Sequence, residues 1–224
     1  MQVPHAEGRA AFLATLDGFV AAVGALDDHA LLATSRCWGW SVVDVVTHVR
    51  LGLEEVAVAL LGVGEAGRAP DRDAASYWRT VPPGNGADEV AGLLAVRRVA
   101  SATRVPTGAL APLQAVTGAL GTAVGRLDDD VLAFQGWVLT TGDFLATWAV
   151  ELAVHQLDLD RDLDVAGPAP AGLSLARRTV EALVGTALPV DDDASAVLLG
   201  TGRRPLTTAE RRGLGPAAER LPAL

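Results

Sequence analysis

The stretch DFLATWAVELAVHQLD, residues 143–158, decides the fold of this chain. Its apolar residues recur at the spacing of a buried helix, and two ionisable residues, Glu151 and His155, interrupt them. Residues four positions apart lie one turn apart on the same helical face. Apart from these two, that face is almost wholly apolar, and it comprises Phe144, Trp148, Glu151, Leu152, His155 and Leu159. A buried carboxylate is costly unless it is neutralised, paired or bound to a metal, so this face predicts a polar site inside the core.

The bulk composition limits the classes of protein that the chain can represent. Its 224 residues, half of them apolar, predict one domain of generous size. The net charge is −9 and there is no block of basic residues, which argues against a nucleic-acid partner. No uninterrupted apolar stretch reaches the roughly 18 residues of a membrane helix. Cys37 is the single cysteine, and the N-terminus lacks the pattern of a signal peptide, so we expect a cytoplasmic protein without a disulfide.

Helical periodicity accounts for most of the chain and predicts an all-α fold. No confident long strand is found, although residues 131–139 predict a connection with a short extended piece. The longer predicted helices cover residues 7–26, 42–61, 87–104, 110–127, 141–163 and 171–188, and shorter helices follow within 194–199 and 206–224. The segments 87–104 and 110–127 are also compatible with one bent helix.

Two of these helices carry start signals. Ser41 precedes Asp44 by three residues, and Thr140 precedes Asp143 by the same spacing, as in a capping box. The helix that begins after Ser41 is apolar nearly all round, which places it centrally in the core. It carries a lone histidine, His48, in its second turn.

His48, Glu151 and His155 are therefore three polar residues that face the core from two helices. In helical bundles, sites are built from side chains that project inward from facing helices. Three protein ligands with an open fourth position are the arrangement of a catalytic zinc ion, although the same donors also suit iron, nickel or manganese. An exposed or purely structural Glu–His pair is the alternative interpretation.

Other residues have two interpretations each. Asp158 lies one turn after His155 and would orient it as a ligand, or it is a surface carboxylate. Cys37 is either a small buried filler or a reactive thiol. Tyr77, Trp78 and Arg79 interrupt a Gly- and Pro-rich loop over residues 62–86, where they either line a pocket or pin the loop to the surface.

Three segments carry a resemblance to a known family. WSVVDVVTH (40–48), FLATWAVELAVHQLDL (144–159) and LLGTGRRPL (198–206) resemble the motifs of the mycothiol-dependent maleylpyruvate isomerase family. The resemblance implies a DinB-like, metal-binding four-helix bundle in which His48, Glu151 and His155 hold zinc or another divalent metal. It also implies mycothiol, an actinobacterial low-molecular-weight thiol, as co-substrate. We expect the bundle to span residues 1–165, with residues 166–224 forming a helical C-terminal extension packed on it.

Together these features predict a zinc- and mycothiol-dependent transferase or isomerase, in which a metal-activated thiolate attacks a small electrophilic substrate. Arg79 and Arg203 are candidates for holding an anionic group of that substrate, because the Arg fork binds carboxylates; ordinary surface charge is the alternative. Two other functions stay open: a non-catalytic metal- or ligand-binding bundle, and a zinc hydrolase that uses metal-bound water.

Overall fold

The computed structural model of the chain describes residues 1–80 and 87–224, without the side chains of residues 87–89. The described part is helical apart from one two-stranded sheet, so the all-α prediction is confirmed. The α-helices are α1 (His5–Gly24), α2 (Asp28–Leu31), α3 (Val42–Leu60), α4 (Ala87–Ala100), α5 (Leu110–Gly125), α6 (Thr141–Leu159), α7 (Pro170–Val184), α8 (Asp193–Gly200) and α9 (Thr208–Leu214). The 3₁₀ helices are η1 (Ser76–Thr80), η2 (Pro106–Ala109) and η3 (Gly215–Arg220), and the strands are β1 (Val131–Phe134) and β2 (Trp137–Thr140).

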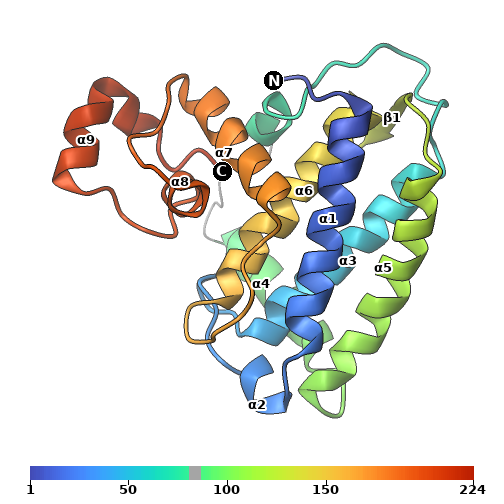
Figure 1. Cartoon of the computed structure of the whole chain (residues 1–224). Helices are drawn as coiled ribbons and strands as arrows, with labels where there is room; N and C mark the ends of the chain where they lie inside the picture. The colour runs from blue at the N-terminus through green and yellow to red at the C-terminus, as the bar shows by residue number, and fades with distance from the viewer. Residues whose placement is uncertain (81–86) are drawn as a thin grey trace.

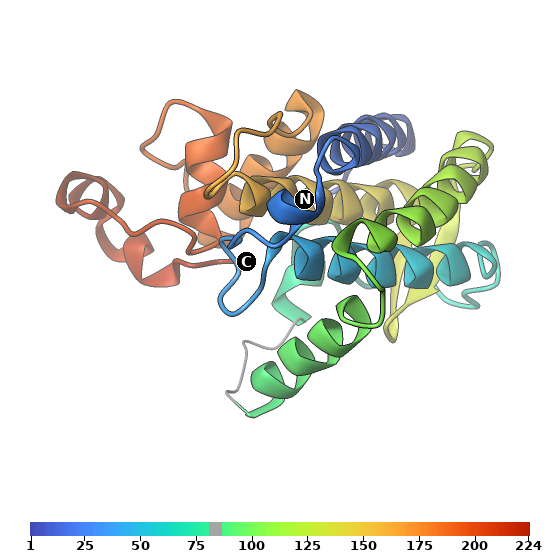
Figure 2. The same ribbon diagram turned by 90° about the horizontal axis from the view of Figure 1, so that it is seen from below.

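Four long helices form the bundle. α1 packs against α5 and α6, and α3 packs against the same two helices, so the four close into a ring around one core (Figure 1). Seen from below, α4 projects away from this ring next to α3 (Figure 2). Within the described residues, no helix is both long and apolar enough to cross a membrane.

The predicted start signals of α3 and α6 are formed. The backbone N–H and the hydroxyl of Ser41 both donate to Oδ2 of Asp44, at 2.9 and 2.7 Å. Thr140 accepts at its hydroxyl from the N–H of Asp143 at 3.1 Å. Asp143 in turn accepts from the N–H of Val3 at 2.8 Å, which ties the N-terminal segment to the start of α6. These side chains satisfy backbone donors that the first turn of a helix leaves unpaired.

Small residues allow α1 and α6 to approach closely. A Cβ atom at Gly8 would lie 2.3 Å from the carbonyl oxygen of Gly142, and one at Gly142 would lie 2.4 Å from the carbonyl oxygen of Val3. Both obstacles are backbone atoms, which cannot rotate aside. The crossing of α1 over α6 therefore requires glycine at these positions.

The C-terminal part covers the outer side of α6. α7 packs on α6 and α1, and α8 packs on α7 and α6. A second apolar cluster within this part comprises Val180, Val184, Leu188, Ala196, Leu199, Leu214 and Ala218. A domain boundary at residue 165 stays a prediction, but the packing encloses α6 between the bundle and the C-terminal helices.

The C-terminal end of α6 differs from the sequence-based expectation, because it lies at Leu159 rather than near residue 163. α4 and α5 are separate helices with η2 between them, so the prediction of two helices is confirmed and the alternative of one bent helix is wrong. Residues 131–140 form an antiparallel hairpin whose turn residues, Gln135 and Gly136, both have positive φ (47° and 85°). This is the backbone of a tight two-residue hairpin turn. The end of the predicted loop over 62–86 lies outside the described residues.

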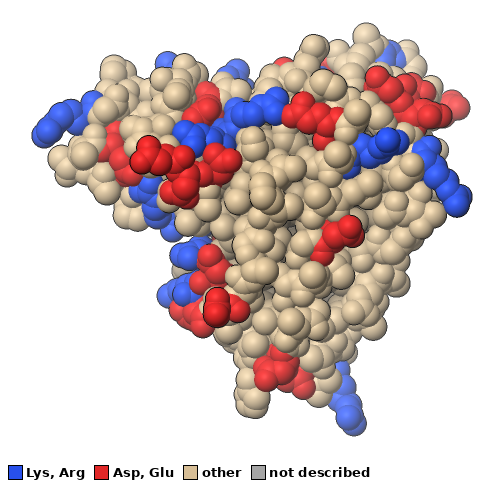
Figure 3. Space-filling model, viewed as in Figure 1, with Lys and Arg blue, Asp and Glu red and all other residues tan. Residues whose placement is uncertain are grey.

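Charged side chains of both signs are mixed on the face shown in Figure 3. Arginines alternate with aspartates and glutamates along its upper edge, and the area below them is mostly uncharged apart from a few separate acidic and basic groups.

We expect Gly8→Ala to lower the free energy of unfolding by about 1–3 kcal/mol, because the added methyl group overpacks the α1–α6 crossing. Gly118→Ala on α5 is the matched control, since a Cβ there meets nothing within 4 Å. Replacing an exposed helical glycine by alanine is expected to stabilise the fold by about 0.5–1 kcal/mol. Urea unfolding of both variants measures the difference. Equal effects of the two substitutions would contradict the close crossing.

Candidate metal centre

Glu151 is the only residue of α6 whose side chain is partly exposed to solvent. Every other residue of this helix is buried, whereas the Glu151 side chain is 23% exposed. It lines a cavity of about 350 Å³ together with His48. An ionisable group placed at the only opening of a buried helix is accessible to a ligand from solvent.

The structure brings together the three residues that the sequence singled out. Nε2 of His48, on α3, lies 3.3 Å from Oε1 of Glu151, and Nε2 of His155 lies 3.1 Å from the same oxygen. The two imidazole centroids are 4.8 Å apart at an angle of 74°. Donors bound to one tetrahedral zinc ion lie about 3.3 Å from one another, so the spacing suits one ion between them. The ligand role of the three residues stays a prediction.

His155 is held by the residue one turn later. Its Nδ1 lies 2.9 Å from Oδ2 of the fully buried Asp158, which acts as acceptor. In a neutral His155 with its proton on Nδ1, Nε2 would be the atom free to bind a metal, and Nε2 is the atom that faces Glu151. This is the arrangement by which a carboxylate orients a metal-binding histidine.

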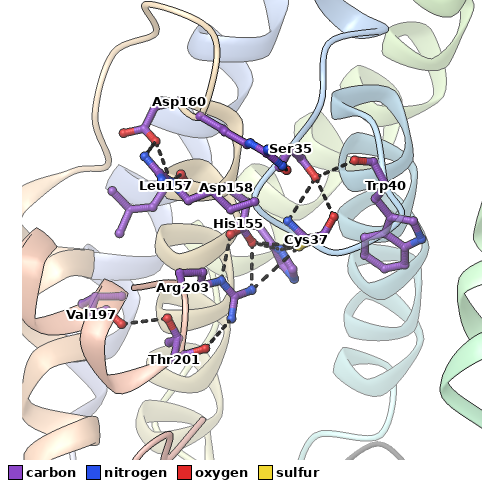
Figure 4. Close-up of polar contacts among 12 residues, drawn as sticks. Ser35, Cys37, Trp40, His155, Leu157, Asp158, Asp160, Val197, Thr201 and Arg203 are labelled. Atoms are coloured by element: carbon purple, nitrogen blue, oxygen red, sulfur yellow. Dashed lines mark hydrogen bonds and ion pairs between the residues drawn. The ribbon is translucent and has the colours of Figure 1, made fainter. Parts of the chain in front are cut away.

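Arg203 pairs with Asp158 from the other side. Its Nε and Nη2 donate to the two carboxylate oxygens at 2.7 and 2.8 Å (Figure 4). A bidentate pair of this kind is strong and directional. Arg203 lies after α8, so the C-terminal part of the chain completes the support of His155.

Cys37 belongs to the same cluster, and it packs against the core without being fully buried. Its side chain is partly exposed, and its thiol donates to Oδ2 of Asp158 at 3.1 Å. The neighbouring Arg36 positions it, because the N–H of Arg36 donates to the carbonyl of Asp158 and its Nε to that of Leu157. These bonds cap the last turn of α6. No sequence signal connects Cys37 with a residue 121 positions later.

A second group of possible metal ligands overlaps the first. Cys37, His155 and Asp158 each offer one atom, and these atoms lie within 4.8 Å of one another. Both oxygens of Asp158 already accept from Arg203, however, and a cation there would have to displace a guanidinium. The group of His48, Glu151 and His155 contains no such competitor among the described residues, and it is the better candidate.

Three ionisable groups along α6, Glu151, His155 and Asp158, have strongly shifted pKa values. Burial alone would raise the pKa of Glu151, but the charge of His155 and hydrogen bonds from both histidines hold it well below its usual range. Burial alone would lower the pKa of His155, but Glu151, Asp158 and Cys37 raise it well above its usual value. Burial is also outweighed at Asp158, where Arg203 and His155 lower the pKa of the carboxyl. The centre therefore holds charged groups that stabilise one another.

The two candidate anion-binding arginines lie in different surroundings. Arg203 is part of the cluster, but its fork is engaged by Asp158. Arg79 is an exposed residue of η1 and does not line the cavity beside Glu151. Its neighbours Tyr77 and Trp78 do line that cavity, as the pocket interpretation of this loop predicted. Binding of a substrate anion by either arginine stays a prediction.

His48 separates two cavities. The cavity of about 350 Å³ lies on its Glu151 side, and a second cavity of about 570 Å³ is lined by His48, Cys37 and Arg203 together with Trp38 and Trp40. Two molecules are thus able to reach the His48 side of the centre from different directions.

Comparison with known proteins gives one finding. The family model described as the mycothiol maleylpyruvate isomerase N-terminal domain matches residues 12–160, which include His48, Glu151, His155 and Asp158. No curated protein and no solved structure matches the chain.

We expect Asp158→Asn to lower the free energy of unfolding by about 3–5 kcal/mol, because it leaves the Arg203 guanidinium poorly compensated in a largely buried place. Asp160→Asn is the matched control: Asp160 pairs with Arg36 at 2.6 Å, but this pair is more exposed and is worth about 0–1 kcal/mol. Chemical unfolding at pH 7 measures both variants.

The same pair sets a pH dependence. The pKa of Asp158 is lower in the folded than in the unfolded protein. The contribution of Asp158 to the free energy of unfolding is therefore fully present above the unfolded pKa of about 4, and it is lost as the pH falls through the folded pKa. The stability gap between the wild type and Asp158→Asn is therefore expected to narrow in acid. A gap that does not change between pH 7 and pH 2 would contradict the pairing.

Proposed function

This chain belongs to the mycothiol maleylpyruvate isomerase N-terminal domain family, and we propose that it is a zinc- and mycothiol-dependent transferase or isomerase that acts on a small electrophilic substrate. The observation that carries the proposal is the convergence of two imidazole nitrogens on one carboxylate oxygen at the single opening of α6.

The donor set fits a divalent metal. His48, Glu151 and His155 would supply two neutral nitrogens and one carboxylate oxygen, which are ligands that zinc accepts, and other divalent metals accept them too. The side chain of His48 is 35% exposed and that of His155 only 8%, so the side of His48 is the accessible one. A fourth ligand would reach the centre there, through either cavity.

A zinc ion bound by these residues would lower the pKa of a coordinated thiol and present it as thiolate near neutral pH. The residues of the chain prepare the site for this. Asp158 accepts from Nδ1 of His155 and so keeps Nε2 available as a donor to the metal. Arg203 neutralises Asp158 and holds it in place.

The proposed reaction starts with attack by the thiolate of mycothiol on an electrophilic carbon of a double bond in the substrate. The C–S bond forms while the π electrons of that double bond move onto the neighbouring atom. If the electron pair of the C–S bond later returns to sulfur, the thiolate leaves and an isomerised product remains. If another group leaves from the carbon instead, the product is an S-conjugate. The first course is an isomerisation and the second a transfer.

Metal analysis tests the donor set directly. We expect purified protein to bind about one equivalent of zinc, and His48→Ala and His155→Ala to reduce the dialysis-stable metal by about tenfold or more, because each removes one of three ligands. His29→Ala is the matched control, since His29 is exposed on α2. Full metal content in both ligand variants would show that the metal centre proposed here is wrong. A protein that binds zinc but no thiol or substrate would be a non-catalytic binding bundle.

A second experiment tests the thiol. Cobalt-substituted protein is expected to gain a thiolate-to-metal absorption band when mycothiol is added, because the sulfur would occupy the open position. The experiment uses the Cys37→Ala variant beside the wild type, since Cys37 lies only 3.9 Å from Nδ1 of His155 and must not be the source of the band. A spectrum that mycothiol leaves unchanged in both proteins contradicts a thiol-dependent reaction and favours a hydrolase that uses metal-bound water.

A further inference from the structure

The smaller of the two cavities beside His48, which we call the aromatic cavity, has aromatic side chains in two of its walls. Trp148 of α6 forms one wall, and Tyr77 and Trp78 of η1 form another. The rings of Tyr77 and Trp78 meet edge-to-face with centroids 5.7 Å apart. Such walls favour a flat or compact apolar molecule.

The room for Trp148 is made by a residue on the facing helix. A Cβ atom at Gly52 would lie 2.6 Å from Cη2 of the Trp148 indole. The indole therefore lies directly on the backbone of α3 at this point. Trp148 is also nearly buried, and it contacts Phe134 of the hairpin edge-to-face at 6.1 Å. The wall is thus fixed from three elements.

The charges around the aromatic cavity are negative. Glu151 and Glu55 are the charged residues among its described lining residues, and no arginine lines it there. Residues 81–89 contain no Arg, Lys or His in their sequence. Burial, Glu151 and Glu55 together raise the pKa of Tyr77 to about 12. A negative charge is therefore disfavoured in this space.

The hairpin turn fixes Glu55 at the rim. The amide of Gln135 donates to Oε2 of Glu55 at 3.3 Å, and its carbonyl oxygen accepts from the hydroxyl of Tyr77 at 2.9 Å. This bridge joins α3 and η1 over the hairpin, so the carboxylate and the aromatic wall are held together.

We propose that the aromatic cavity receives the electrophilic substrate, and that this substrate is a compact apolar molecule, about the size of a substituted ring, without a carboxylate or other negative charge. The role as electrophile rests on the function proposed above. The proposal replaces the expectation that Arg79 or Arg203 holds an anionic group of the substrate, since neither residue lines this cavity. The volume is adequate, because about 150 Å³ suffices for benzene and this cavity has about 350 Å³. The larger cavity, beside Cys37 and Arg203, is left for the thiol.

A bound metal ion and thiol would not reverse the preference of the aromatic cavity for an uncharged substrate. The two positive charges of a divalent ion would be balanced by Glu151 and by the thiolate. Glu55 then remains as the uncompensated charge at the cavity wall, since its only hydrogen-bond partner among the described residues is the neutral amide of Gln135.

The test compares two probes that share one ring and differ in charge. Dissociation constants of benzyl alcohol and benzoate are measured by ligand-observed NMR on the full chain in two forms: loaded with both metal and mycothiol, and after dialysis against a chelator. We expect benzyl alcohol to bind about tenfold more tightly than benzoate in both forms, because benzoate meets the negative wall. Equal or tighter binding of benzoate in either form overturns the proposal, as does absence of binding by both probes.

Matched variants locate the effect. Glu55→Gln is expected to strengthen benzoate binding several-fold and to leave benzyl alcohol unchanged, because only the charge is removed. Glu54→Gln is the control on the same helix, where Glu54 pairs with Arg50 and does not line the aromatic cavity. Trp78→Ala is expected to weaken benzyl alcohol several-fold, whereas Trp38→Ala is not, since Trp38 is 74% exposed and lines the larger cavity. Identical effects within each pair overturn the assignment of the cavity.

Metal analysis of the same samples separates the two proposals. If the protein binds no metal but still binds benzyl alcohol more tightly than benzoate, the metal-dependent function is refuted and the preference of the aromatic cavity for a neutral ligand is supported. Protein that binds metal through His48 and His155 but prefers benzoate supports the metal centre and refutes the substrate class.

Discussion

A chain of paired, mostly buried charges along α6 is the constraint on which the rest of the structure depends. Glu151, His155 and Asp158 occupy successive turns of a helix that is buried along its whole length apart from Glu151. Charges can be buried only when they are paired and hydrogen-bonded. His155 lies between the two carboxylates, and Arg203 pairs with Asp158, the carboxylate farther from the exposed Glu151. Because Arg203 comes from beyond α8, the C-terminal helices contribute both apolar cover for α6 and the cation that makes the burial of Asp158 tolerable.

The same pairing divides the centre into a supporting side and a reactive side. Asp158 and Arg203 satisfy each other and the Nδ1 atom of His155, so their hydrogen-bonding capacity is largely used. Nε2 of His155, the carboxylate of Glu151 and the imidazole of His48 meet where the helix opens. A ligand or ion is therefore able to bind beside Glu151 without breaking the ion pair between Asp158 and Arg203. The two cavities at His48 then give access from two directions.

Much of the fold was predictable because its signals are local. The capping residues of α3 and α6 lie three positions apart in sequence, and their hydrogen bonds are formed. The convergence of His48 with Glu151 and His155 was predictable because two central apolar helices must face each other, and a polar residue on each buried face has nowhere else to go. The C-terminal end of α6 was less predictable, because Arg36 from a distant loop caps it. The sequence predicted a short extended piece here but not its pairing into a hairpin, because a four-residue strand carries little periodicity of its own.

The sequence by itself determined the helical class, the helix start sites and the ionisable residues that the core must accommodate, because these follow from spacing within one helix. Only the tertiary structure decided which partners those residues receive. Cys37 lies in the cluster because a loop docks on the end of α6, and Arg203 faces Asp158 rather than open solvent because α7 and α8 fold back over the bundle. Glu55, Gln135 and Tyr77 meet at one rim although they come from α3, a hairpin and a 3₁₀ helix. Contacts between such separate segments are set by how whole elements pack, and residue spacing along the chain does not contain that information.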